Sequence, residues 1–436
     1  MNNYLKRKHG STDDAAPRCS MRVDRASAGE VLLACLGSGA GEDAWLGQMS
    51  DVDWDEVIRE SARQGITPLF YKRLRAADPG AVVPARVTGL LREFSIGSAL
   101  KSLRLYHELS EILDALRSEE IPVIVLKGAY LAECVYGDKA LRPMRDLDLM
   151  VRRCDLSRAE AKLVEMGYRQ RPEPYAEWDY SASAHLHPLT KPGGVVIEIH
   201  WTIESPTEPF AIDVEGLWGR ARPAKIAGVD VLVLSPEDLL LHLCLHTAFH
   251  HQLVLGLRGC WDILETIRHF GKAIDWEQLQ RRARRWGVAK YVCLTLHLAK
   301  ELVGAAVPAE ALAGLEPSGL EPRLIALARA EILGQTTTVP VSARFAQMWG
   351  SSRILEKASL LVKTVFPTKK SLGRMYPACR GPRWLYLYYP VRWRDLLRQY
   401  GPSAWQMARR DENVTALVRR EHERAILMDW LKSASL

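Results

Sequence analysis

Two aspartates separated by one residue lie within an otherwise apolar stretch of this sequence. Asp146 and Asp148 occur in LRPMRDLDLMV, residues 141–151, among leucine, methionine and valine. The DLDLMV segment predicts a β-strand, on which residues two apart project from the same face. The two carboxylates are therefore expected to point together. They would repel each other and raise each other's pKa, so their burial requires a compensating cation.

Two kinds of cation could compensate these carboxylates. Ion pairs with the nearby Arg142, Arg145 or Arg152 would give the aspartates a purely structural role. A divalent cation would give them a chemical one, because Mg²⁺ prefers one or two carboxylates together with phosphate oxygens. The similar DVDWDE stretch at 51–56 needs no metal, since its acids begin a predicted helix and favour the helix dipole there. The spacing of the aspartates leaves both explanations open.

A third acid occurs in a second predicted strand. Glu198 is the lone carboxylate of VVIEIHW, residues 195–201, and His200 shares its face of the strand. If this strand lies beside the first, Glu198 reaches the two aspartates. Three acids in that arrangement indicate a two-metal site for phosphoryl or nucleotidyl transfer. For His200, substrate contact and packing both remain open.

A lysine and a glycine precede the aspartates where another strand turns into a helix. VLKG places Lys127 and Gly128 at this turn. Glycine lets the backbone approach a phosphate, and a helix N-terminus offers free N–H groups. Lys127 and Arg142 are cations that could neutralise a triphosphate, although a solvated lysine at a strand end would look the same.

The surrounding sequence predicts the elements that position these residues. The 436 residues exceed one compact core. Helical periodicity precedes residue 120, an α/β unit of about four strands and two helices occupies 121–205, and helices follow Ser235-Pro236. The predicted division is a disordered lead-in at 1–25, a helical region at 26–119, an α/β core at 120–234 and a helical region at 235–436.

Composition limits the classes of function. The net charge of +7 has no dense Lys/Arg tract behind it, so nucleic acid is not the expected partner. The eight cysteines are scattered without a CxxC pair, and no apolar stretch is long enough to span a membrane. A cytoplasmic protein with reduced thiols is therefore expected.

Two further patterns have structural explanations. His242, His246 and His250 recur every fourth residue, but they lack the glutamate of HExxH, which favours packing over a zinc site. Asp262 is a charge on an otherwise apolar helix and is expected to pair with Arg258 four residues earlier.

The motifs occur in an order that resembles one known family. K-G at 127–128, R-P-M-x-D-x-D at 142–148 and E-x-H-W at 198–201 are similar in combination to the uncharacterised nucleotidyltransferases of the DNA polymerase β superfamily. The resemblance covers most of the chain after about residue 50.

The resemblance implies an α+β fold, with a small mixed sheet and flanking helices. It also implies a Mg²⁺-dependent, ATP- or other NTP-using enzyme, with two metal ions bound by Asp146, Asp148 and Glu198. An acceptor hydroxyl, positioned or deprotonated by Glu198, would attack the α-phosphate and release pyrophosphate, while Lys127 and Arg142 hold phosphates.

One position departs from the superfamily pattern. Its usual glycine-serine pair is Gly128-Ala129 here, so a phosphate-binding hydroxyl is missing. The longer spacing to Asp146 leaves room for Arg142 and Arg145 to compensate. The acceptor can be a small molecule, a peptide or natural product, or a protein. The alternative is a catalytically weak or inactive protein that binds a nucleotide or a partner and retains the fold.

Overall fold

The computed structural model describes residues 28–36, 49–76, 83–170, 183–333, 366, 389–396, 398 and 412–433. The predicted lead-in at 1–25 lies outside this part of the chain. No helix of the structure, searched over the described residues, is both long and apolar enough to cross a bilayer.

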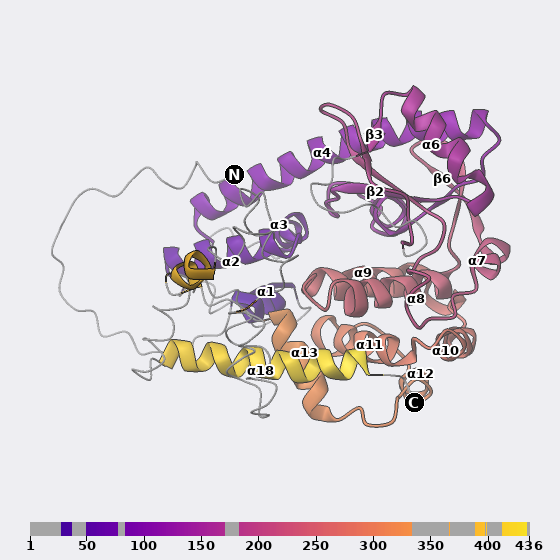
Figure 1. The fold of residues 1–436 in the computed structure, drawn as a ribbon. Coiled ribbons are helices and arrows are strands. Elements are labelled where there is room, and N and C mark those ends of the chain that lie inside the picture. The colour runs from indigo at the N-terminus through magenta and orange to yellow at the C-terminus, as the bar shows by residue number, and fades with distance from the viewer. Residues whose placement is uncertain are drawn as a thin grey trace.

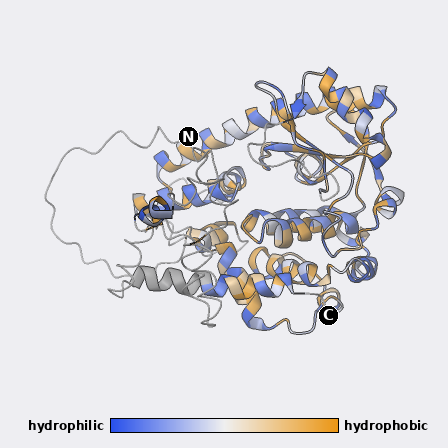
Figure 2. Cartoon of the chain, viewed as in Figure 1, coloured by the Kyte–Doolittle hydropathy of each residue, from blue (hydrophilic) through white to orange (hydrophobic). Residues whose placement is uncertain are grey.

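Among the described residues, four helices precede the sheet. They are α1 (Ala28–Leu36), α2 (Asp51–Arg63), α3 (Thr67–Ala76) and α4 (Ala85–Ser118). Ser50 and Asp53 form a capping box at the start of α2, which confirms that the acids of DVDWDE begin a helix. Polar and apolar residues are interleaved along α4, as expected for a long helix that buries only one face (Figure 2).

In the described part of the chain, one seven-stranded mixed sheet forms the centre of the predicted α/β region. Its strands are β1 (Ile124–Val125), β2 (Asp146–Met150), β3 (Arg169–Gln170), β4 (Leu189–Thr190), β5 (Val196–His200), β6 (Arg222–Ile226) and β7 (Val229–Val233). The order is β3-β4-β5-β2-β1-β7-β6, with β2 parallel to β5, β1 parallel to β7, and the other neighbours antiparallel.

The predicted fold class is confirmed, and the sheet is larger than the sequence indicated. The hairpin of β6 and β7 escaped prediction because RPAKI is mostly exposed and polar, without the apolar alternation of a half-buried strand. The predicted turn at KPGG is confirmed, since β4 and β5 pair on either side of it. In the two central strands, Leu147, Leu149 and Ile197 are fully buried.

Helices and single turns fill the connections and the rest of the described chain. They are α5 (Lys127–Tyr130), η2 (Leu131–Val135), η3 (Arg153–Asp155), α6 (Leu156–Glu165), α7 (Val214–Arg220), α8 (Pro236–Leu245), η4 (His246–His250), α9 (Leu257–Phe270), η5 (Gly271–Ala273), α10 (Trp276–Arg285), α11 (Ala289–Val303), α12 (Ala309–Ala313), α13 (Pro322–Leu333) and α18 (Glu412–Lys432). Figure 1 shows α4 and α6 beside the sheet, with α8 and α9 between the sheet and α11.

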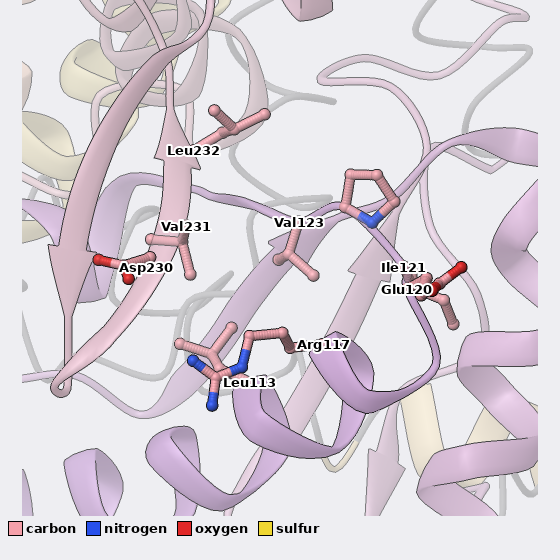
Figure 3. A pocket seen from close by; sticks show the side chains of 9 residues that line it. Leu113, Arg117, Glu120, Ile121, Val123, Asp230, Val231 and Leu232 are labelled. Carbon is pink, nitrogen blue, oxygen red and sulfur yellow. The ribbon is translucent and has the colours of Figure 1, made fainter.

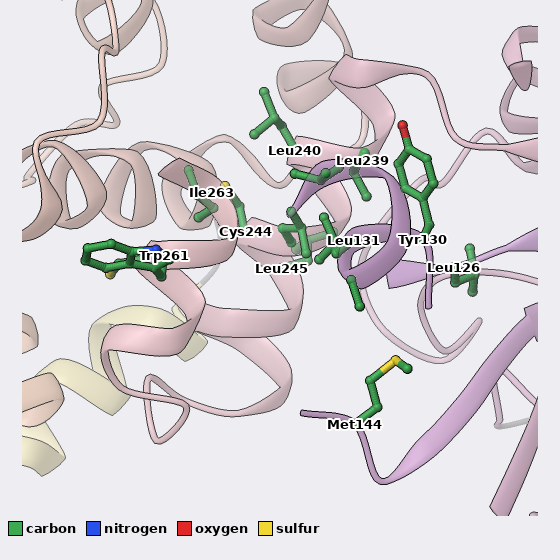
Figure 4. Packing of buried hydrophobic residues seen from close by; sticks show 14 of the residues in the cluster. Leu126, Tyr130, Leu131, Met144, Leu239, Leu240, Cys244, Leu245, Trp261 and Ile263 are labelled. Atoms are coloured by element: carbon green, nitrogen blue, oxygen red, sulfur yellow. The ribbon is translucent and has the colours of Figure 1, made fainter. Parts of the chain in front are cut away.

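The turn after β1 is anchored by apolar packing. Leu126 and Leu131 are buried in the same cluster as Leu239 and Leu245 of α8 and Trp261 of α9 (Figure 4). This cluster of buried apolar side chains extends from α1 through the sheet to α18. The predicted domain limits at 119/120 and 234/235 stay predictions.

Candidate active site

The two central parallel strands bring the predicted carboxylates together. Asp148 of β2 lies directly opposite Glu198 of β5 in the register, and His200 follows on the same face of β5. Ligand atoms of Asp148, Glu198 and His200 all lie within 4.8 Å of one another. Asp146 projects from the same face of β2 as Asp148. The cluster therefore joins residues fifty positions apart in the sequence.

Asp148 is buried, and Lys127 and His200 lie against its carboxylate. Lys127 Nζ and His200 Nε2 each lie 3.2 Å from Asp148 Oδ1. The backbone N–H of Leu126 donates to the carbonyl of Asp148 at 3.0 Å, which fixes Lys127 beside it. Burial alone would raise the pKa of Asp148, but Lys127 and the hydrogen bond from His200 hold that pKa well below its usual range. Asp148 is therefore ionised at neutral pH.

Asp146 and Glu198 have different environments. Burial raises the pKa of Asp146, and repulsion from Asp148 raises it further. The hydrogen bond from His200 is the main cause that lowers the pKa of Glu198, against its burial; the two side chains lie 3.6 Å apart, between Nε2 and Oε2. These same hydrogen bonds outweigh the desolvation of His200 and raise its pKa. The charge of Asp148 is thus well compensated, whereas the charge of Asp146 is disfavoured.

The arginines near β2 do not compensate the aspartates. Arg142 is buried, and its Nε and Nη2 each donate to one carboxylate oxygen of Asp262 on α9 at 2.8 Å. Arg152 pairs instead with the exposed Glu215. Arg145 is exposed, and no carboxylate of the described residues lies within ion-pair distance of it. The structure therefore contains none of the predicted ion pairs between the two aspartates and these three arginines.

The Arg142–Asp262 pair corrects two expectations. Asp262 does not pair with Arg258, because Arg142 occupies both of its oxygens and Tyr136 donates its hydroxyl to Asp262 Oδ1 at 2.8 Å. Arg142 also does not face open space where a phosphate would bind. Its remaining Nη1 donates to the carbonyl of Gly128 at 3.3 Å. Arg142 therefore fixes the strand-to-helix turn in this structure.

Gly128 and Ala129 form the floor of this turn. A Cβ on Gly128 would lie 3.1 Å from Met144 Sδ and 3.5 Å from Arg142 Nη1, so glycine permits close packing against the segment that leads into β2. Ala129 is buried, and its carbonyl accepts a hydrogen bond from Tyr106 at 2.6 Å. Arg142 and Tyr106 thus hold two consecutive carbonyl groups. Neither replaces the missing hydroxyl at Ala129.

The histidine stripe of α8 and η4 has other partners. His246 Nε2 lies 3.2 Å from His251 Nε2, and His250 Nε2 lies 2.9 Å from Glu204 Oε1, while His242 is buried. Within the described residues, these histidines belong to no group of three or more ligands that could hold a metal ion. The packing interpretation of the stripe stays a prediction.

A cavity of about 370 Å³ lies apart from the carboxylates. It is lined by the end of α4, the segment that leads into β1 and part of β7, including Arg117, Val123 and Asp230 (Figure 3). None of the candidate site residues lines it. The carboxylate face of β2 and β5 is therefore the candidate active site, and not this cavity.

The ligand types at the cluster fit a divalent cation. Carboxylate oxygens are the ligands that Mg²⁺ prefers, and a cation would favour the charged form of Asp146, whose pKa is raised first by burial and then by repulsion from Asp148. An imidazole nitrogen is compatible with Mn²⁺ and other transition metals as well. Of the predicted ligands, Asp148 and Glu198 belong to this group together with His200, whereas Asp146 is not one of its three members and stays a predicted ligand.

Comparison with protein families now gives the class of protein: the chain is a nucleotidyltransferase. It belongs to the family of uncharacterised nucleotidyltransferases, whose model matches residues 50–304, more than half of the chain. The family predicted from the K-G, R-P-M-x-D-x-D and E-x-H-W motifs is confirmed. A comparison with curated proteins finds no match.

One solved structure is similar to part of the chain. The antibiotic-resistance factor ANT(2'')-Ia is 18% identical over 44% of this chain and 95% of its own, with a TM-score of 0.30. An overlap this loose carries no inference about the site of this chain.

The structure adds residues that sequence reasoning did not place in the site. Asp262 holds Arg142 and accepts a hydrogen bond from Tyr136, and the His185 ring lies 4.9 Å from the His200 ring. The one available signal was the charge of Asp262 on an apolar helix. Its partner could not be found from the sequence, because 120 positions separate the two residues.

Proposed function

We propose that this protein transfers an NMP group from an NTP to a hydroxyl-bearing acceptor and releases pyrophosphate, in a reaction that depends on Mg²⁺. The observation that carries the proposal is the register of β2 and β5, which places Asp148 opposite Glu198 beside Asp146 and His200. This arrangement matches the predicted chemistry of the family. In this proposal, four residues of the cluster would hold the metal: Asp146, Asp148, Glu198 and His200.

When bound, the metal ions supply charge neutralisation at the attacking and leaving oxygens. The protein's own residues do the rest. Asp148 stays ionised because of Lys127 and His200, so it is ready to bind a cation at neutral pH. Glu198 has a lowered pKa and is a weak base. Its role is therefore to accept a hydrogen bond from the acceptor hydroxyl and to orient that group.

The phosphate-binding residues follow from position and exposure. Lys127 stands at the first turn after β1, beside Asp148, and Arg145 directly precedes Asp146 with its side chain exposed. Gly128 lies next to Lys127 in the same turn. Arg142 acts through the carbonyl of Gly128 and not on a phosphate. Lys127 and Arg145 would therefore contact the triphosphate. Arg142 would hold in position the turn that carries Lys127 and Gly128.

The position of a radioactive label distinguishes this reaction from its relatives. The purified protein is incubated with Mg²⁺, a cell extract as the source of acceptor, and NTP labelled either at the α- or at the γ-phosphate. We expect the α-label to enter a new product and the γ-label to appear as pyrophosphate. Entry of the γ-label into the product would indicate phosphoryl transfer and contradict the proposal. Fractionation of the product into small molecules, peptides and proteins then identifies the class of acceptor.

A further inference from the structure

The pairing of Asp262 with Arg142 leaves a neighbouring arginine without a carboxylate. Arg258 lies one helical turn before Asp262 on α9, but both oxygens of Asp262 receive hydrogen bonds from Arg142. No carboxylate oxygen of the described residues lies within 4.0 Å of the Arg258 guanidinium. A partly buried guanidinium that no acid compensates is unfavourable. An anionic ligand would remove this cost.

Arg258 is held at the entrance to the catalytic strand. Its Nη2 donates to the carbonyl of Pro143 at 2.6 Å, three residues before Asp146. This contact fixes the guanidinium beside the segment that leads into Asp146, and the side chain remains partly exposed. A ligand whose phosphates extend from the aspartates toward this segment would meet it.

Two glycines allow this placement. Gly65, between α2 and α3, has a φ of +67°, and a Cβ there would lie 3.1 Å from Arg258 Nη1. A Cβ on Gly256, just before α9, would clash with the Gln64 side chain. Gln64 Oε1 accepts a hydrogen bond from the backbone N–H of Leu257 at 2.8 Å. The turn after α2 therefore holds the first turn of α9 through Gln64 and leaves space for the Arg258 side chain.

The charges near the site support an anionic ligand of this kind. Lys127 is paired with Asp148, and Arg142 with Asp262. With a divalent cation bound at the carboxylate cluster, the charges of Asp146 and Glu198 would be offset as well. Among the described residues, no carboxylate would then lie within ion-pair distance of Arg258 or of the exposed Arg145. A guanidinium binds phosphate oxygens well because its N–H groups form a planar fork.

We infer that Arg258 binds the β- or γ-phosphate of the NTP, in the place that sequence reasoning gave to Arg142. This inference rests on the proposed function. It assigns a phosphate-binding residue from the C-terminal helical region to a site whose other residues lie on β1, β2 and β5.

Binding of nucleotides with different numbers of phosphates tests the inference. We compare the wild type with Arg258→Gln and Arg258→Lys by calorimetric titration with the Mg²⁺ complex of the NTP that stabilises the wild type most, and with the corresponding NMP. Arg268→Gln is the matched control, since Arg268 is an exposed arginine on the same helix that pairs with Glu265. A glutamine at position 258 removes the guanidinium and its charge and keeps a polar amide, whereas lysine keeps the charge without the planar fork.

We expect Arg258→Gln to weaken Mg²⁺·NTP binding about tenfold to a hundredfold, the usual range for a hydrogen bond to a charged group. NMP affinity should stay within about twofold, Arg258→Lys should lie between the wild type and the glutamine variant, and Arg268→Gln should bind like the wild type. Equal NTP affinity in wild type and Arg258→Gln would overturn the inference, as would an equal loss for NTP and NMP. If the glutamine variant does not fold, a wild-type NTP affinity in Arg258→Lys overturns it. Failure of the wild type to bind any NTP would overturn the proposed function and this inference with it.

Discussion

Replacement of Asp148 by asparagine is expected to lower the rate of NMP transfer by about a thousandfold, since loss of a charged metal ligand costs about 4 kcal/mol of transition-state stabilisation. Asparagine has nearly the same shape, so the strand and its register with β5 are preserved. The change removes the carboxylate whose ionised form Lys127 and His200 stabilise. The measurement is the initial rate at which α-label enters the product.

A carboxylate outside the cluster provides the control for this prediction. Glu215 is exposed and pairs only weakly across the surface with Arg152, so Glu215→Gln should transfer NMP at the wild-type rate. A rate for Asp148→Asn within about tenfold of the wild type would exclude Asp148 as a metal ligand in the reaction.

The second large effect is expected for stability. Asp262→Ala should lower the free energy of unfolding by about 3–5 kcal/mol, because it leaves the buried charge of Arg142 uncompensated. It also removes the acceptor of the Tyr136 hydroxyl. Urea denaturation of the metal-free protein measures this loss without any contribution from nucleotide binding.

Two comparison variants show whether the buried pair is the cause. Asp114→Ala removes an acid from an exposed pair with Arg117 on α4 and should change stability by no more than about 0.5 kcal/mol. Arg142→Met/Asp262→Leu removes both charges together and should recover much of the stability lost in Asp262→Ala. If the double variant is as unstable as the single one, an unpaired Arg142 does not explain the loss.

The central part of the site was predictable because local rules define it. Alternation on a strand placed Asp146 with Asp148 and Glu198 with His200. An apolar stretch identified β2 and a β-branched stretch identified β5, and the glycine after Lys127 marked the turn that follows β1. In the sequence, the order of the family's motifs indicated that these residues belong to one site. The match to the family model confirms that family.

The long-range partners were not predictable, because no local rule sets them. Arg142 lies four residues before Asp146 and was assigned to phosphate on that ground, yet the fold brings α9 to it. Helical spacing suggested the pair of Arg258 with Asp262, but the better geometry of the Arg142 fork takes both oxygens. The hairpin of β6 and β7 was missed for a related reason, because its exposed residues carry no apolar pattern.

Thermal unfolding in the presence of each NTP tests most directly the claim that the aspartates bind a metal–nucleotide complex. The experiment compares the wild type with Asp146→Asn/Asp148→Asn, with and without Mg²⁺. A ligand at about a hundred times its dissociation constant stabilises a protein by about 2.7 kcal/mol and shifts the unfolding midpoint by several degrees. We predict such a shift for the wild type only with Mg²⁺, and none for the double variant. No shift in the wild type, or an equal shift in the double variant, would contradict the proposed site. A shift without any transfer of α-label would instead support a protein that binds a nucleotide but does not turn it over, because Ala129 lacks the hydroxyl of the usual serine.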